Sequence, residues 1–294
     1  MTPATDLFEQ HRNLLFSVAY RMLGSAADAE DVVQDSWLRW ADVDPGTVEQ
    51  PKAYLVRIAT NLALNRLRSA QRRRESYVGP WLPEPIETGP DAAQEVELAE
   101  SVSMAMLVVL ETLTPDERAV FVLREVFGYP HAQIAGILGR GESSVRQLAH
   151  RARSHVQARR PRFEADNDLR ERLTDRFLAA AATGDIAQIM DVLAPDVVLS
   201  TDGGGRVRAA RNPIHGADKV GRWFAGVTQR PWQGVALSEL VFEPRVLNGA
   251  HSLVAWHEGR AISTITIEVV DGRIGEIRIV ANPQKLARLR PNRA

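Results

Sequence analysis

Cysteine is absent from this chain of 294 residues. Its absence excludes disulfides, a thiol nucleophile and a cysteine-ligated zinc site. No apolar run approaches membrane-spanning length, and the first residues, MTPATDLFEQHR, lack the apolar core of a signal peptide. We therefore expect a cytoplasmic protein without a membrane partner, and the length predicts two or three domains.

Charge is distributed unevenly along the chain, although the formal net charge is only -1. Residues 57–74 hold six arginines and no acid, and residues 140–162 hold seven arginines with Glu142 as the only acid. Residues 84–117, between them, carry nine carboxylates and neither Lys nor Arg. Two basic segments around an acidic connector would let the protein hold two DNA segments without coating DNA indiscriminately.

A helix-turn-helix pattern lies between residues 114 and 160. Apolar stripes at helical spacing predict two short helices, around 134–138 and 145–156, and Gly139-Arg140-Gly141 supplies a tight turn between them. The polar face of the second helix, Glu142 to Arg159, carries side chains that can reach phosphates and base edges in a major groove. These candidates are Ser143, Ser144, Arg146, Gln147, His150, Arg151 and Arg153. A solvated cationic helix end is the alternative.

Residues 5–75 are expected to be wholly helical. One helix should end near Gly24, a second should run from Asp28 to Trp40, and a third from Lys52 to Arg74, after a break that contains Pro45, Gly46 and Pro51. The third helix interleaves amides with arginines, a combination suited to base edges and backbone phosphates. The side chains concerned are Arg57, Asn61, Asn65, Arg66 and Arg68, followed by Arg72, Arg73 and Arg74. Asn61 and Asn65 could instead be ordinary surface residues.

Three segments, residues 19–40, 51–73 and 113–153, resemble in order and spacing the sigma-2 and sigma-4 domains of extracytoplasmic-function (ECF) sigma factors. The resemblance covers about the first 160 residues. It implies a transcription initiation factor that binds core RNA polymerase, recognises the -35 and -10 promoter elements and promotes promoter opening. It also implies that the chain is not an enzyme and needs neither a cofactor nor a metal.

The resemblance assigns a role to each helix. The helix from Asp28 to Trp40 would dock on a coiled coil of the clamp of the largest polymerase subunit. The helix from Lys52 to Arg74 would read and help to open the -10 element, and the helix from Glu142 to Arg159 would enter the -35 major groove. Core-binding candidates are Asp31, Gln34, Asp35, Trp37 and Leu38; the -10 candidates are Asn61, Asn65 and Arg66 at the bases and Arg68, Arg72, Arg73 and Arg74 at the backbone.

Promoter opening requires a surface that holds unstacked bases. Unstacking a base costs a few kcal/mol, so the opened strand must be held by compensating contacts. We expect the third helix and the loop from Asp42 to Pro51 to make these contacts.

The rest of the chain combines an extended connector with an α+β region. Prolines at 80, 83, 85 and 90 predict a semi-rigid strap over residues 77–90, in which Trp81 and Leu82 should dock on a surface. Residues 166–294 predict helices followed by a curved antiparallel sheet. The expected elements are helices around 169–177, 186–193 and 216–227, and strands at 196–201, 235–247, 251–258, 261–270 and 273–281.

This C-terminal region resembles the SnoaL-like, NTF2-related cone. Asp202-Gly203-Gly204-Gly205-Arg206, together with Trp81-Leu82-Pro83-Glu84-Pro85, resembles the signature of ECF sigma factors that carry a fused SnoaL-like extension. The implied domains are sigma-2 (1–75), a Pro-rich acidic linker (76–100), sigma-4 (101–162) and the SnoaL-like domain (166–294). The resemblance also implies a regulatory interdomain contact that replaces a separate anti-sigma protein; a packed linker and a wide turn are the alternatives. Its residues are Trp81, Leu82, Pro83, Asp202, Gly203, Gly204, Gly205 and Arg206.

The cone leaves other functions open. Some SnoaL relatives are cyclases or isomerases, and the proton-transfer candidates here are Asp202, His215, His251 and His257. A pocket for a small-molecule effector is the better interpretation, although its aromatic residues could simply fill the core. These residues are Trp223, Phe224, Trp232, Phe242 and Trp256. A DNA-tethered enzyme, a ligand sensor and a ligand-responsive repressor are therefore the alternatives to an initiation factor.

Overall fold

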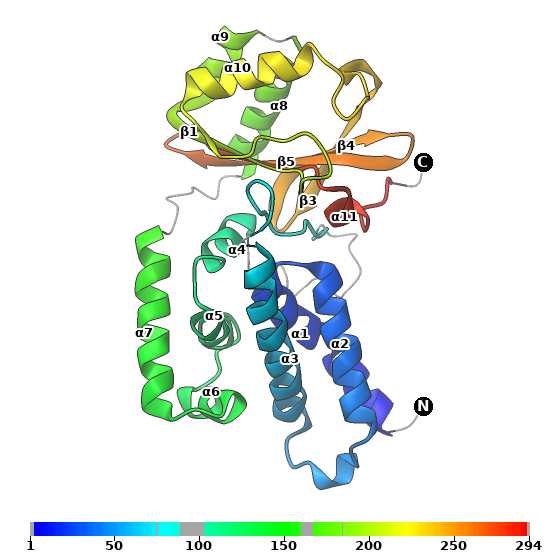
Figure 1. Cartoon of the computed structure of the whole chain (residues 1–294), viewed down its shortest axis with the longest axis vertical. Coiled ribbons are helices and arrows are strands. Elements are labelled where there is room, and N and C mark those ends of the chain that lie inside the picture. The colour runs from blue at the N-terminus through cyan, green and yellow to red at the C-terminus, as the bar shows by residue number, and fades with distance from the viewer. Residues whose placement is uncertain (1–2, 75, 89–102, 160–166, 184, 293–294) are drawn as a thin grey trace. The chain divides into compact units, whose positions relative to one another are not determined.

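The computed structural model describes residues 3–74, 76–88, 103–159, 167–183 and 185–292 (Figure 1). The chain divides into two compact units. The first contains Met1–Glu75 and Pro90–Arg160, and the second contains Ser76–Gly89 and Pro161–Ala294. The strap after the first helical region is therefore part of the C-terminal unit, a placement that the sequence pattern did not indicate.

The first unit begins with the three helices that the sequence predicts, which form the first helical region. They are α1 (Pro3–Leu23), α2 (Ala26–Ala41) and α3 (Pro51–Arg74). Gly24 lies at a positive φ of 66° after α1, and Ser25 caps α2 by accepting a hydrogen bond from the Asp28 amide. Trp40 is fully buried and its indole nitrogen donates to the Ala4 carbonyl at 2.8 Å. The helices thus share one core.

The second helical region contains the predicted helix-turn-helix, which is confirmed. Its elements are α4 (Met104–Leu110), α5 (Pro115–Phe121), the π-helical turn η3 (Val122–Val126), α6 (His131–Leu138) and α7 (Glu142–Arg159). Thr114 and Glu117 form a capping box at the start of α5. Gly139 adopts the left-handed conformation that ends α6 and allows the tight turn into α7.

The two helical regions pack against each other within the first unit. Helix α3 contacts both α5 and α6. Arg118 is 1% exposed and donates from Nε to the carbonyl of Arg21 at 3.0 Å, and it also pairs with Glu111. The buried guanidinium of Arg118 thus bonds across the two helical regions. If the regions separated and no water entered, its hydrogen-bond donors would have no acceptors, so these bonds make the packing specific.

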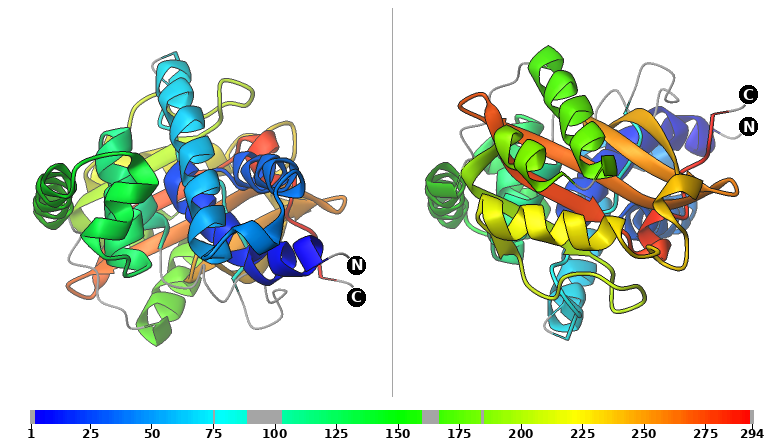
Figure 2. Two further views of the ribbon diagram at one scale, coloured as in Figure 1. Left: turned by 90° about the horizontal axis from the view of Figure 1, so that it is seen from below. Right: turned by 90° about the horizontal axis from the view of Figure 1, so that it is seen from above.

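The second unit is the expected α+β structure. It contains α8 (Asn167–Thr183), α9 (Ile186–Val192), β1 (Leu193–Asp202), β2 (Ile214–His215), α10 (Ala217–Thr228), η4 (Leu237–Glu239), β3 (Val241–Leu247), β4 (Ala250–His257), β5 (Arg260–Val270), β6 (Arg273–Val280) and α11 (Pro283–Leu286). The strand order is β2-β1-β6-β5-β4-β3, with only the β1–β6 pair parallel among the described strands. Helices α8, α9 and α10 lie over one face of the sheet (Figure 2).

The elements of this unit differ from the expected ones at four places. Strand β1 begins at Leu193, three residues before the expected start at residue 196. The strand expected over 235–247 begins at Val241, because Leu237–Glu239 forms a 3-10 turn and Val235 pairs back with Trp232. Strand β2 and helix α11 were not predicted. The hairpin at Asp271 and Gly272 is confirmed, and both residues have the positive φ that a type I′ turn requires.

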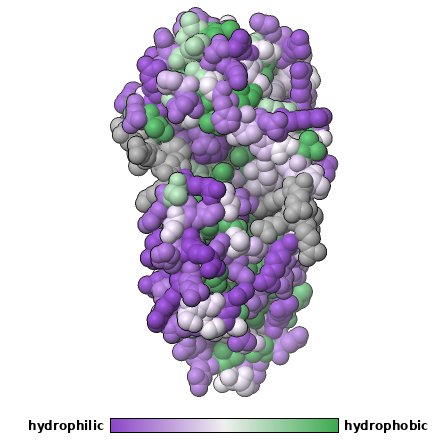
Figure 3. Space-filling view, turned by 60° about the vertical axis from the view of Figure 1, so that its left-hand side comes forward, coloured by the Kyte–Doolittle hydropathy of each residue, from purple (hydrophilic) through white to green (hydrophobic). Residues whose placement is uncertain are grey.

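Polar side chains dominate the surface. Hydrophilic residues cover most of the face in Figure 3. Five large apolar side chains remain exposed in the described part of the chain: Leu38, Val78, Ile186, Met190 and Val241. Ile186 and Met190 lie one turn apart on α9. Within the same residues, no helix combines the length and apolar character that crossing a bilayer requires.

Candidate nucleic-acid interface and strap anchor

Helix α3 carries its predicted DNA contacts in different environments. Asn65 and Arg68 are exposed, whereas Asn61 and Arg66 are partly buried. The side chains of Arg72, Arg73 and Arg74 lie outside the described residues. On α7, Ser144 is partly buried and the other candidates are exposed: Ser143, Arg146, Gln147, His150, Arg151 and Arg153. The exposed positions follow one side of the helix, because the apolar residues Val145, Leu148, Ala149, Ala152 and Val156 bury the other.

Five of the predicted DNA-contact arginines are paired with carboxylates of the same unit, whereas the Arg57 guanidinium lies 5.6 Å from the centroid of the Tyr54 ring. Only the pair of Arg146 with Glu142, one helical turn apart, follows a local sequence pattern, since the other partners are far apart in the chain. The pairs are Arg66 with Asp31 and Asp35, Arg68 with Asp116, Arg146 with Glu142, Arg151 with Glu117, and Arg153 with Glu125. Their N–O distances lie between 2.6 and 3.0 Å. In these pairs the carboxylates accept hydrogen bonds that the guanidinium groups could otherwise donate to DNA phosphates.

Contacts between the helical regions also occupy the α3 face. The Asn61 side chain donates to the carbonyl of Ile137, in α6, at 3.2 Å. Asp116 accepts from Arg68 at 3.0 Å and from Arg140, in the helix-turn-helix turn, at 2.5 Å. In this arrangement Asn61 is engaged with protein, so it must exchange that bond before it can contact a base.

The predicted polymerase-binding face of α2 contacts the predicted -10 face of α3 at Arg66. Arg66 binds Asp31 at 3.0 Å and Asp35 at 2.8 Å. These hydrogen bonds and charges raise the pKa of Arg66 despite its partial burial, so the guanidinium remains charged. Of the other α2 candidates, Gln34 is exposed, Leu38 is 60% exposed, and Trp37 packs edge-on against Phe8 with ring centroids 5.1 Å apart.

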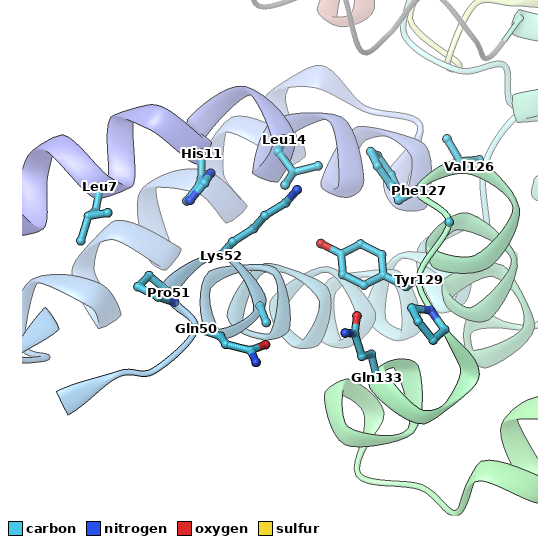
Figure 4. Close-up of a pocket in the computed structure, with 13 residues that line it drawn as sticks. Leu7, His11, Leu14, Gln50, Pro51, Lys52, Val126, Phe127, Tyr129 and Gln133 are labelled. Carbon is cyan, nitrogen blue, oxygen red and sulfur yellow. The ribbon is translucent and has the colours of Figure 1, made fainter. Parts of the chain in front are cut away.

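A hollow of about 730 Å³ lies where α1, the start of α3 and residues 126–133 meet (Figure 4). His11, Lys52 and Tyr129 border it from these three segments. Burial, together with the nearby Lys52 charge, lowers the pKa of His11. Burial raises the pKa of Tyr129, whose hydroxyl has no hydrogen-bond partner among the described residues. Burial at the hollow therefore favours the neutral forms of His11 and Tyr129.

Asp202 is the centre of the strap anchor, which we define as Asp202, Tyr77, Leu82, Asn282 and Lys285. Its side chain is fully buried. It accepts hydrogen bonds from the Tyr77 hydroxyl at 2.6 Å, the Leu82 amide at 2.8 Å and the Lys285 ammonium at 2.6 Å. Asn282 donates to the Tyr77 hydroxyl at 3.0 Å. One carboxylate thus joins the strap, the end of β1 and helix α11.

The glycine loop after Asp202 approaches the strap closely. Gly204 and Gly205 both have positive φ. A Cβ at Gly204 would lie 2.3 Å from the Asn282 amide nitrogen and 3.0 Å from the Tyr77 hydroxyl, and one at Gly205 would lie 3.1 Å from Val78. Any other residue at Gly204 would combine backbone strain with collision. Gly203 is buried and Arg206 is exposed at the end of the loop.

The strap residues that were expected to dock are either buried in the second unit or lie against a charged group of that unit. Leu82 is 3% exposed, Pro83 is buried, and the Lys285 ammonium lies 4.0 Å from the Trp81 ring centroid. Further along, the Thr88 amide donates to Val246 at 2.8 Å and the Asn248 amide donates to Ile86 at 2.9 Å. The strap therefore also pairs with the outer edge of β3.

The proton-transfer candidates do not converge on the cone cavity. That cavity, of about 320 Å³, is lined by Trp223, Phe224, Trp232 and Phe242 among others, but not by Trp256, whose ring lies beneath Arg245. Asp202 belongs to the strap anchor, and the cavity lining includes none of the three histidine candidates, which are His215, His251 and His257. Across the described residues no group of three or more His, Asp or Glu side chains could hold a metal ion.

Sequence reasoning missed three members of the strap anchor. Tyr77, Asn282 and Lys285 come together only through folding, with 205 positions separating Tyr77 from Asn282. No periodicity or motif links segments so far apart. A buried acid such as Asp202 does require a compensating cation and donors, but the sequence alone could not show that Asp202 is buried.

Family models match both helical regions. Residues 7–73 match the model for sigma-70 region 2, and residues 103–156 match the model for sigma-70 region 4. These segments contain α1 to α3 and α4 to most of α7, the helices that carry the predicted DNA and polymerase contacts. The class of protein is therefore a promoter-recognising initiation factor of the sigma-70 type.

Similar proteins extend the match over the whole chain. The ECF RNA polymerase sigma factor SigJ of Mycobacterium tuberculosis is 40% identical over 287 residues, covering 95% of this chain and 91% of that protein. The probable ECF RNA polymerase sigma factor SigI of the same species is 31% identical over 292 residues, covering 98% and 96%. The crystal structure of SigJ has a TM-score of 0.76 at 36% identity and covers 96% of this chain and 98% of its own.

The chain belongs to the ECF RNA polymerase sigma factors. Proteins of this family bind core RNA polymerase and recognise promoter DNA, and they are initiation factors, not enzymes. The likeness to SigJ includes the C-terminal unit, so helical sigma regions followed by a helix-and-sheet domain are a shared architecture.

Proposed function

We propose that α3 with residues 42–50 contacts the -10 element, that α7 enters the -35 major groove, and that the exposed face of α2 docks on the polymerase clamp. The observation that supports this assignment most directly is the set of exposed or partly exposed arginines on α3 and α7 that pair with carboxylates of the same unit: Arg66, Arg68, Arg146, Arg151 and Arg153. Exposed ion pairs contribute about 0 to 1 kcal/mol each, so promoter phosphates can replace the carboxylates at little cost.

Promoter binding in this proposal includes a step in which the helical regions separate. The Asn61 bond to Ile137 and the Asp116 bonds to Arg68 and Arg140 must break before α3 can face DNA. Polymerase and promoter together supply the replacement contacts. Displacement of the internal carboxylates lowers the affinity for every DNA by a similar small amount, so tight binding requires the further contacts that promoter and polymerase supply.

The C-terminal unit controls this separation through the strap. The strap begins three residues after the end of α3, and its last described residue, Thr88, is hydrogen-bonded to β3. While the strap stays anchored, only residues 89–102 join it to the second helical region. A chain spans at most about 3.5 Å per residue, so the anchor limits how far the regions can move apart. Asp202 and its loop thereby tune promoter output within one chain.

A small molecule in the cone is the effector in this scheme, and the protein acts where RNA polymerase works, in the cytoplasm. The cavity beside α8 and α10 supports the effector site, since it is apolar and of a size suited to a small ligand. Binding of the small molecule in the cone would change the strap anchor. Through the anchor it would change how far the two sigma regions can move apart.

Run-off transcription with core polymerase tests the proposal. Full-length protein should direct initiation at a defined start site, and a chain ending at Arg162 should initiate with a different efficiency because its strap has no anchor. Failure of full-length protein to join core enzyme or to initiate at any promoter would refute the assignment.

A matched pair of arginine variants tests the role of α7. Arg146 and Arg222 are similarly exposed, at 66% and 63%, and each pairs with an acid one helical turn away. Arg146→Gln should lower promoter affinity and reduce its salt dependence by about one counterion. Arg222→Gln, in the C-terminal unit, should leave both unchanged. Equal effects from the two variants would contradict a -35 contact by α7.

A further inference from the structure

The cone contains an apolar cavity of about 320 Å³. Its walls come from α8, α10, residues 232–242 and strands β5 and β6. The lining residues carry no charge: Phe177, Leu178, Ala179, Ala181, Trp223, Phe224, Val227, Trp232, Leu237, Leu240, Phe242, Ser263, Ile265 and Ile279. A cavity of this size and lining suits a ring system or a short chain.

Trp232 supplies an unused hydrogen-bond donor at this cavity. Its indole nitrogen is buried and has no partner within the part of the chain that the structure describes. The ring is held edge-on to Trp223, with centroids 5.7 Å apart, and the backbone pairs with Val235. A buried N–H without an acceptor is unfavourable by about 1 to 3 kcal/mol, so an acceptor atom on a bound molecule would be stabilised there.

A basic hollow of about 520 Å³ shares part of the cavity wall. Trp223, Val227 and Trp232 line both spaces. Arg208, Arg222 and Arg230 line the hollow, and none of its lining residues is acidic, although Asp218 pairs with Arg222. The unused Trp232 donor therefore belongs to a residue at the boundary between an apolar space and a cluster of arginines. This boundary provides hydrogen-bonding and positive charge for an anion beside room for an apolar body.

We propose that the cone binds an amphipathic organic anion, with its ring or chain in the apolar cavity and a single carboxylate-type head at Trp232 and the arginines. Binding itself does not depend on the proposed function; the regulatory consequence rests on it. Apolar burial supplies affinity, and the head group fixes orientation. Uncharged molecules of the same shape bind more weakly, because they leave the arginine cluster without a partner.

The cavity is connected to the strap anchor through β6. Ile279 lines the cavity, and the next residue, Val280, is paired with Asp202 in the sheet. The Ala281 and Asn282 amides then donate to the Asp202 carbonyl at 2.8 and 2.9 Å. A ligand that displaces Ile279 thus acts one residue away from the strand pairing that positions the Asp202 carboxylate.

Calorimetric titration of the full-length protein with 2-naphthoate and 2-acetylnaphthalene tests the proposal. The two probes share an apolar body and differ in head charge. We expect one site per chain, with naphthoate bound about tenfold more tightly than the ketone. Absence of naphthoate binding, or equal binding of the two probes, would overturn the proposal.

Two variants and their controls locate the site. Ala181→Phe fills the cavity and should abolish binding of both probes, whereas Ala187→Phe, at an exposed position of α9, should not. Combined Arg208→Gln and Arg230→Gln should reduce naphthoate affinity to that of the ketone and leave the ketone unaffected. Arg172→Gln with Arg176→Gln, on the exposed side of α8, is the charge control. Naphthoate binding that persists in Ala181→Phe, or that falls equally in both arginine pairs, contradicts the proposed site.

The transcription assay separates this proposal from the regulatory one. A protein that initiates transcription but binds neither probe disproves the ligand site alone. Binding that the variants alter as expected supports the site, whether or not naphthoate changes transcript yield. The yield measures only the coupling to the strap.

Discussion

The carboxylate of Asp202 accepts a hydrogen bond from the backbone amide of Leu82 at 2.8 Å, although 120 positions separate the two residues. A backbone amide cannot be replaced by another side chain, so this bond fixes the path of the strap and not merely the position of one residue. Because Asp202 also pairs with Lys285, whose ammonium donates to the Leu82 carbonyl, the anchor contains a buried charge pair in direct contact with the strap.

Replacement of Asp202 should release the strap. Asp202→Asn keeps the size of the side chain but removes the charge partner of Lys285, so the second unit should lose about 3 kcal/mol of unfolding free energy. Hydrogen exchange over residues 77–88 should accelerate more than exchange in β4 and β5. Promoter output in a purified system should change, because the strap then no longer limits the sigma regions.

Asp196→Asn is the control for this experiment. Asp196 lies on the same strand and is exposed, so its replacement should alter neither exchange nor stability measurably. Unchanged transcription by an Asp202→Asn protein whose strap exchange has accelerated would show that the strap does not regulate output.

Removal of an internal acid should strengthen promoter binding. Glu117 holds Arg151 at 2.9 Å and also caps α5 with Thr114. Burial alone would raise the pKa of Glu117, but hydrogen bonds from Arg151 and Thr114 hold it below its ordinary value. Glu117→Gln retains a residue type suited to the capping box and frees Arg151. Holoenzyme affinity for a -35 duplex should rise about threefold, the scale of an exposed ion pair.

Fluorescence anisotropy over a salt series measures this effect. The gain should shrink as salt increases, because screening weakens both the internal pair and the phosphate contact. Glu171→Gln, an exposed acid of α8 in the other unit, is the control. An equal gain from Glu171→Gln would mean that net charge, and not release of Arg151, determines the affinity.

The helical regions could be predicted because local signals determine their boundaries. Gly24 and Gly139 occur where a left-handed residue ends a helix, and Thr114 with Glu117 marks the start of α5. The sheet was less predictable where its structure depends on distant pairing. The residues before Val241 have strand-like composition, yet Leu237–Glu239 turns. Contacts with the rest of the fold decide whether such short segments form strands or turns.

The residue types of the candidate site could be predicted from the sequence, but the partners of each side chain in the folded protein could not. Interleaved amides and arginines on α3 pointed to nucleic acid, and the family comparison agrees with the class of function. The sequence could not show that Asn61 contacts Ile137 or that Arg68 shares Asp116 with Arg140, because these pairs join separate helices. Apart from the i,i+4 pair of Glu142 and Arg146, these surface arginines meet their carboxylate partners through packing between helices, which no local pattern encodes.

The packing of the helical regions should weaken at mildly acidic pH. Burial and Lys52 lower the pKa of His11 in the folded state below the unfolded value of about 6.5. As the pH falls, His11 is protonated in the unfolded chain before it is protonated in the folded one. The contribution of neutral His11 to the free energy of unfolding is therefore complete above pH ~6.5 and is lost as the pH falls through the folded pKa. Over a titration from about pH 7.5 downward through the unfolded value of about 6.5, His11→Gln should flatten the pH dependence of hydrogen exchange in α1 and α3.

His150→Gln removes an exposed histidine outside this hollow and is the matched control. It should leave the pH dependence of α1 and α3 exchange as in the parent protein. A His11→Gln profile that follows the parent throughout the acid range would exclude His11 as the titrating group.

The buried ion network of the second unit should be essential for its fold. Glu268 is 3% exposed and contacts Arg278 at 3.3 Å and Arg170 at 3.4 Å. Burial raises its pKa, although both arginines oppose the shift. Glu268→Gln leaves two buried guanidinium groups without this shared counter-charge, and urea unfolding should show a loss of about 3 kcal/mol. Glu276→Gln, whose carboxylate is 23% exposed and pairs with Arg278 alone among the described residues, should lose clearly less. Equal losses would contradict the special role of Glu268, because the buried, shared carboxylate would then contribute no more than the partly exposed one.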